Sequence, residues 1–210
     1  MTDKIPMYKI DKIVFGAILG IMIPAICSMI TFLIGFYEFE EKYIPYFFIA
    51  GLVAGLVVDI LLLKKLLNDL FDLPLWIIAC TFILCNILIY GFFMGFPVFN
   101  LLTGIVAGYY SGRRIIAGNI LTPRRENFIG KVLLFSVLVM IFICFSSAFL
   151  ALSEKTIGEE LSGMLGLSFV PGKGLIIAGI IAGGLVLIGL QYMLTRLVLY
   201  KTIEFSDSIS

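Results

Sequence analysis

Residues 13–37 read IVFGAILGIMIPAICSMITFLIGFY and contain no charged side chain. An α-helix over this stretch would rise about 37 Å at about 1.5 Å per residue, enough to cross a hydrocarbon core of about 30 Å. The stretch is too long for the apolar core of a signal peptide, and no A-x-A cleavage pattern follows it. Pro24 lies near its middle, where the missing amide is expected to kink the helix. These residues therefore predict a transmembrane helix.

Further apolar segments predict further spans. They cover residues 45–63, 74–93, 97–117, 128–152 and 174–200. The chain is 61% hydrophobic and 14% charged, against about 45–50% and about 25% in soluble domains, and its mean hydropathy is +1.12. A soluble fold of this size could not bury so much apolar surface. We expect an all-α polytopic membrane protein, a single membrane domain over residues 1–210 built as a six-helix transmembrane bundle of three hairpins.

Lysine and arginine are distributed unequally between the two sets of loops. If the N-terminus is cytoplasmic, that side holds Lys4, Lys9, Lys12, Lys64, Lys65, Arg113, Arg114, Arg124, Arg125, Lys131, Arg196 and Lys201, whereas the other side holds Lys42, Lys155 and Lys173. Short loops on the cytoplasmic side of a membrane carry an excess of lysine and arginine. Both termini are therefore predicted to be cytoplasmic, and the expected location is the plasma membrane of a prokaryote.

A glycine motif recurs in three of the predicted helices. It reads AGLVAG at 50–55, TGIVAG at 103–108 and AGIIAG at 178–183. Glycines four residues apart share a helix face and allow a neighbouring backbone to approach closely. Those expected to pack helices are Gly51, Gly55, Gly104, Gly108, Gly112, Gly179 and Gly183. Packing within one chain and packing against a partner subunit both remain open, as do a parallel repeat of three hairpins and coincidence in a glycine-rich sequence.

Three polar residues inside predicted spans are candidates for a substrate or ion site, because ionisable and amide groups are costly in a bilayer. Asp59 is the only carboxylate inside a span, five residues before Lys64. An ion pair at the inner leaflet and a proton- or cation-coupling site are the two interpretations. Asn86 and Gln191 lie near the middle of their spans, where an amide either bonds across helices or lines a substrate site.

Three connections carry further signals. Residues 111–131 contain Arg113, Arg114, Arg124, Arg125 and Lys131, a set expected to bind anionic head groups or a partner. Around residues 156–165, Thr156 precedes Glu159 by three positions, a capping-box pattern, and apolar residues recur with helical spacing. This pattern predicts a short amphipathic helix on the outer face. Residues 95–100 are expected to form a turn in which Asn100 caps the next helix, or an inserted gate.

The absence of histidine from the sequence removes the commonest general base and metal ligand. The four cysteines lie in apolar runs, and no nucleotide-binding or zinc motif is present. We therefore expect no enzymatic activity, no cofactor, no bound metal and no nucleic-acid partner. The expected partners are the lipid bilayer and either other membrane subunits or a second copy of the chain.

Two function classes fit these features. The first is a membrane transport protein, or the substrate-binding membrane subunit of a larger transporter, for a small molecule. The second is a non-catalytic scaffold, assembly or partner-binding subunit of a membrane complex. In size and expected topology the chain is similar to the small substrate-binding subunits of energy-coupling-factor transporters. The similarity concerns only this outline, and it assigns a role to no residue.

Overall fold

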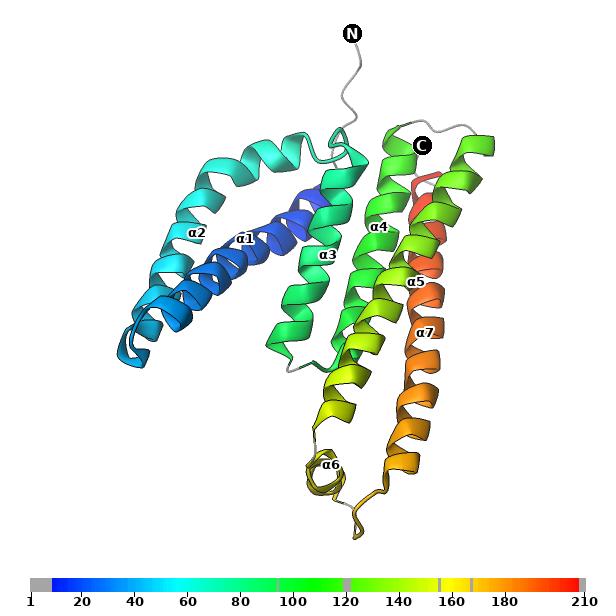
Figure 1. Cartoon of the computed structure of the whole chain (residues 1–210). Helices are drawn as coiled ribbons and strands as arrows, with labels where there is room; N and C mark the ends of the chain where they lie inside the picture. Colours follow the sequence, from blue (N-terminus) through cyan, green and yellow to red (C-terminus); the bar gives the residue numbers. More distant parts are fainter. Residues whose placement is uncertain (1–8, 94, 119–121, 155, 167, 208–210) are drawn as a thin grey trace. The chain divides into compact units, whose positions relative to one another are not determined.

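The computed structural model describes residues 9–93, 95–118, 122–154, 156–166 and 168–207, and this part of the chain is helical without strands. Figure 1 shows the order of the elements. The α-helices are α1 (Lys9–Glu38), α2 (Ile44–Asn68), α3 (Leu75–Phe92), α4 (Leu101–Ala117), α5 (Thr122–Ser153), α6 (Ile157–Leu165) and α7 (Lys173–Asp207). Two short 3₁₀ helices, η1 (Glu41–Tyr43) and η2 (Pro97–Asn100), precede α2 and α4.

Five of the described helices are long and apolar enough to cross a membrane. They cover Asp11–Glu38, Glu41–Asn68, Leu75–Phe92, Arg124–Ser153 and Lys173–Phe205. The segment expected as the fourth span forms η2 and α4. Because α4 has 17 residues and carries Arg113 and Arg114 near its end, it is not one of the five.

The sequence predicts one membrane domain, and by its contacts the chain forms two compact units, Met1–Ala79 and Cys80–Ser210. In the first unit α1 and α2 pack as an antiparallel hairpin. Their closest approach is at two glycines. A Cβ on Gly51 would lie 2.6 Å from the carbonyl oxygen of Cys27, and a Cβ on Gly55 would overlap Pro24.

In the second unit α4 and α7 run parallel, and α5 packs against both. A Cβ on Gly104, Gly108 or Gly112 would lie within 3 Å of α7 atoms. At Gly108 the nearest atom is the backbone oxygen of Thr195, at 2.5 Å. The apolar core lies at one end of this packing and consists of Ile115, Ile129, Leu133, Leu199 and Ile203.

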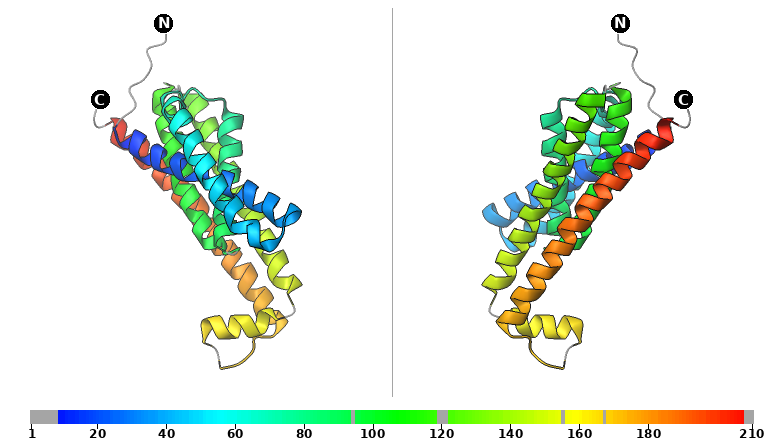
Figure 2. Two further views of the ribbon diagram at one scale, coloured as in Figure 1. Left: turned by 90° about the vertical axis from the view of Figure 1, so that its left-hand side faces the viewer. Right: turned by 90° about the vertical axis from the view of Figure 1, so that its right-hand side faces the viewer.

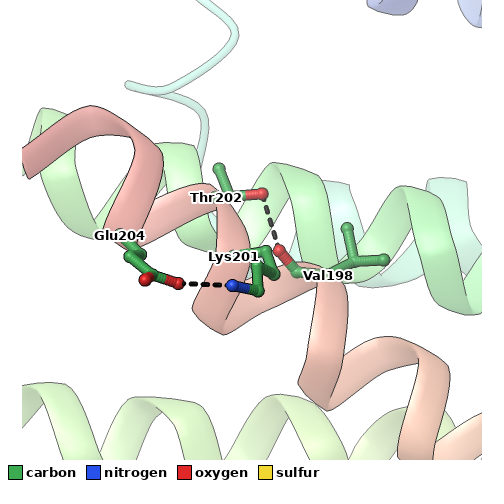
Figure 3. A network of polar contacts seen from close by, with 4 residues as sticks. All are labelled: Val198, Lys201, Thr202 and Glu204. Atoms are coloured by element: carbon green, nitrogen blue, oxygen red, sulfur yellow. Dashed lines mark hydrogen bonds and ion pairs between the residues drawn. The ribbon is translucent and has the colours of Figure 1, made fainter. Parts of the chain in front are cut away.

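Many large apolar side chains face outward on both units, as lipid contact requires. Ile60 on α2 is 80% exposed and Phe145 on α5 is 70% exposed. Near the C-terminal end of α7, an exposed ion pair joins Lys201 Nζ to Glu204 Oε2 at 2.8 Å (Figure 3). The helix therefore changes from an apolar to a charged surface near its end.

The third glycine pair differs from the first two. Apart from the adjacent backbone of α7 itself, no atom of the described chain lies within 4 Å of a Cβ placed on Gly179 or Gly183. Both glycines are exposed on the first half of α7. Of the two alternatives, packing within one chain is therefore not found at these two positions among the described residues, and packing against a partner subunit stays open.

The short helix α6 lies across the ends of α5 and α7 (Figure 2). Thr156 is its N-cap residue but makes no side-chain bond to the backbone. Its φ and ψ of −95° and 1° are not the extended values that a capping box needs. The hydroxyl instead donates to Oε1 of Glu160 at 2.9 Å. The expected capping box with Glu159 is therefore wrong, although a short helix forms here.

Alanine at Gly108 is expected to destabilise the protein, and alanine at Gly179 is its matched control on α7. A methyl group at Gly108 meets backbone atoms of Thr195 and Leu199, so the helices must separate, at a cost of about 1–3 kcal/mol. At Gly179 the methyl group enters open space, and the better helix propensity of alanine is expected to leave stability unchanged or slightly higher. Thermal unfolding in detergent measures both. Equal melting temperatures would contradict close α4–α7 packing.

Candidate functional site

A buried amide cluster joins α3 to the start of α4. The Nδ2 of Asn100 donates to the backbone oxygen of Asn86 at 2.9 Å and to its Oδ1 at 3.0 Å. The Thr103 hydroxyl lies 3.0 Å from the same Oδ1 and 2.7 Å from the backbone oxygen of Asn100. Asn86 in turn donates to the backbone oxygen of Phe82. Asn100 therefore bonds across helices, and the expected side-chain cap on α4 is not formed.

A second buried cluster joins α5 to α7. The Nε2 of Gln191 donates to the hydroxyl of Ser136 at 2.8 Å, and that hydroxyl lies 3.2 Å from the hydroxyl of Thr195. The Gln191 amide lies directly against Gly104 of α4, since a Cβ there would be 2.9 Å from Oε1. Glycine at this position therefore provides the space that the amide occupies.

The two clusters are adjacent on α4. Thr103 belongs to the amide cluster, and the next residue, Gly104, contacts the Gln191 amide of the second cluster. Their six polar side chains are Asn86, Asn100, Thr103, Ser136, Gln191 and Thr195, and none is more than 4% exposed. Polar groups buried in apolar helices need partners, since each unpaired group costs about 1–3 kcal/mol. The polar core of the second unit is therefore organised mainly by its own hydrogen bonds.

Two buried acceptors of this core lack a donor among the described residues. They are Oδ1 of Asn100 and Oε1 of Gln191. An amide oxygen accepts up to two hydrogen bonds. The arrangement can therefore bind N–H or O–H groups, and it offers acceptors rather than charge.

Of the three polar residues expected at a substrate or ion site, Asn86 and Gln191 lie in the two clusters of the second unit. Asp59 belongs to the first unit, where it faces Gly20 of α1. Of the two interpretations of Asp59, an ion pair at the inner leaflet or a proton- or cation-coupling site, the ion pair is not seen, because Oδ1 has no partner in the described part of the chain. Lys64 is about 140° away from Asp59 around α2 at 3.6 residues per turn, so the two side chains diverge.

Four residues of the clusters are not among the site candidates predicted from the sequence. For Asn100 the sequence predicts a helix cap or part of an inserted gate, and for Thr103, Ser136 and Thr195 it predicts no role. The feature of the sequence that indicates these residues is their spacing. Asn100 and Thr103 are three residues apart and Gln191 and Thr195 are four apart, which places each pair on one helix face.

The five basic residues between positions 111 and 131 do not form one exposed patch. Most of this segment is helical, since α4 continues to Ala117 and α5 begins at Thr122. Arg113 is buried, and Arg114 donates to the hydroxyl of Tyr110 at 2.7 Å. On α5, Arg124 and Lys131 are exposed and Arg125 is half-buried. Only part of this set is therefore accessible to head groups or a partner.

Comparisons with known proteins add no function to this geometry. The chain matches no protein-family model. Neither a curated protein nor a solved structure matches it. In the described residues, no group of three or more cysteine, aspartate or glutamate side chains is placed to hold a metal ion.

Replacing Ser136 by alanine is expected to lower the free energy of unfolding by about 1–2 kcal/mol, because the Gln191 amide loses its acceptor. Ser146→Ala on the same helix is the matched control, since that hydroxyl donates only to its own helix, at Phe142. Unfolding in mixed detergent micelles measures both.

The double variant Ser136→Ala/Gln191→Leu is expected to regain much of the loss, since removing both partners of a buried bond is nearly neutral. Additive losses from the two single substitutions would contradict coupling between these side chains.

Proposed function

We propose that the chain is a membrane transport protein, or the substrate-binding membrane subunit of a larger transporter, for a small polar solute. The observation that carries this proposal is the pair of buried amide oxygens, Asn100 Oδ1 and Gln191 Oε1, without donors in the described chain. A solute with N–H or O–H groups would supply the missing donors. Such sites discriminate strongly against analogues that lack the donor, because the buried acceptors are then left unpaired.

The proposed topology has six spans with both termini cytoplasmic. With about 1.5 Å per α-helical and about 2 Å per 3₁₀ residue, η2 and α4 together rise about 33 Å, close to the thickness of the hydrocarbon core. Packing of α4 parallel to α7 supports a shared direction of crossing. The distribution of lysine and arginine supports the orientation.

Single cysteines introduced into a cysteine-free background test this topology. We expect a membrane-impermeant maleimide, added from outside, to modify cysteine at positions 40 and 158 but not at 68 or 124. Labelling after permeabilisation is the control for accessibility at the latter two. The reverse pattern would contradict the orientation, and external labelling at 40 and 124 but not at 158 would contradict a sixth span.

Solute binding is tested by thermal stability of the purified chain against primary amines, amino acids, polyols and nucleobases. We expect at least one class to raise the melting temperature, since a ligand at 100 times its Kd stabilises by about 2.7 kcal/mol. Fully N- or O-methylated analogues should not do so. Gln191→Met should reduce the shift and Ser146→Ala should keep it. No shift with any probe would contradict the proposal.

A scaffold or partner-binding subunit is the second candidate, and one observation favours it. Gly179 and Gly183 present an open glycine pair on α7, a surface suited to close packing with another membrane helix. Purification in mild detergent separates the two functions. A stoichiometric partner that is lost in Gly179→Leu, together with no solute binding, would favour the scaffold.

A further inference from the structure

The face of α2 that packs on α1 consists of Gly51, Gly55 and Asp59, the three buried residues of this helix. They are spaced four residues apart and therefore share one side of the helix. At the first two positions the helices approach so closely that only glycine fits. The third position of the same face carries a carboxylate, which is 9% exposed.

The residue opposite Asp59 has an unusual backbone. Oδ2 of Asp59 lies 3.2 Å from the position of a Cβ on Gly20. Gly20 is four residues before Pro24, which lies inside α1. Proline has no amide hydrogen, so the carbonyl of the residue four positions earlier loses its helical donor. Oδ2 of Asp59 therefore lies beside Gly20, the residue of α1 whose carbonyl proline leaves without its helical amide donor.

The contact between Asp59 and Gly20 lacks a hydrogen-bond donor. An ionised carboxylate and a carbonyl are both acceptors, and Oδ1 of Asp59 has no partner among the described residues. The hydroxyls on this side of α1 do not supply one. Ser28 donates to the backbone of Pro24 at 2.7 Å, and Thr31 donates to the backbone of Cys27 and Ser28.

The other charged groups of α1 and α2 lie far from Asp59. Within three residues of Gly20 on α1, and within three residues of Asp59 on α2, the sequence contains no other titratable side chain. On α1 the nearest are Cys27, toward the outer end, and Lys12, about 12 Å along the axis toward the inner end. On α2 Lys64 is about 7–8 Å along the axis and points away. An ion pair therefore does not supply the missing partner.

A metal cation is a poor occupant of this contact. Sodium-like and divalent cations are held by about six oxygens, and Asp59 and the Gly20 carbonyl provide fewer. One turn away, Gly55 packs directly on Pro24, so the helices leave little space for an ion. A proton needs no cavity, and it converts one of the two acceptors into a donor.

We propose that Asp59 and the carbonyl of Gly20 form a proton-binding site within the α1–α2 hairpin. The protonated carboxyl donates its O–H to the carbonyl that Pro24 leaves without an amide. When the proton dissociates, a carboxylate faces a carbonyl oxygen, and this contact between the helices becomes repulsive. The site lies in the first unit and does not depend on the solute proposed for the second.

Infrared spectroscopy of the full chain in phosphatidylcholine vesicles tests this site directly. At neutral pH we expect the carbonyl stretch of a protonated carboxylic acid, absent in Asp59→Asn and retained in the surface control Glu159→Gln. The band should diminish reversibly when the pH is raised. No such band in the unsubstituted protein, or a band that persists in Asp59→Asn, would overturn the proposal.

Pro24→Ala tests the acceptor, because alanine restores an amide donor to the Gly20 carbonyl. We expect the carboxylic acid band to shift in this variant, whereas an unchanged band would overturn donation to Gly20. Stability gives a second measurement. Asp59→Asn should retain the melting temperature, since its amide can donate to the same carbonyl, and Asp59→Leu should lower it. A large loss in Asp59→Asn would instead indicate that an ionised carboxylate holds the hairpin together.

Discussion

Close approach between helix backbones is the constraint on which both units depend. Lipid tails are as apolar as leucine, so helices in a bilayer gain little by hiding apolar side chains from them. Association must come from van der Waals contact and hydrogen bonds at short range. Gly55 against Pro24, and Gly108 against Thr195, bring backbones close enough that a single methyl group would overlap the neighbouring helix or press against its backbone. These contacts fix how far each helix can slide along its partner.

The register set by glycine decides which polar groups can meet. Gln191 donates to Ser136 while its amide packs against Gly104. A side chain at position 104 would fill the space that the amide occupies. In the hairpin, the contact of Gly55 with Pro24 places Asp59 one turn further along, opposite Gly20. Polar residues within these helices are therefore not isolated features. Gln191 lies directly across from Gly104, and Asp59 lies one turn from Gly55 and opposite Gly20.

The sequence predicts the all-helical class and six spans, five of which are long apolar helices in the structure, because hydrocarbon thickness constrains helix length directly. It also indicates Asn86 and Gln191, since an amide within an apolar run is conspicuous. It does not reveal the partners. Ser136 and Ser146 look alike in the sequence, because a helical serine can bond its own backbone. Ser146 does so and Ser136 does not. Only the facing helix makes that difference, and the pairing of helices is a tertiary property.

Glycine spacing alone does not separate a packed helix face from an open one. The pair at Gly179 and Gly183 has the same spacing as the packed pairs, but leucines precede and follow it at intervals of four residues. The packed faces instead carry or meet a polar residue, Asp59 in the hairpin and Gln191 at Gly104. Lipid tails can cover glycine and leucine without leaving a hydrogen-bonding group unpaired, whereas a polar group needs a neighbour. A polar residue one turn from the glycines, or directly across the interface from them, is therefore the better indicator of an interior face.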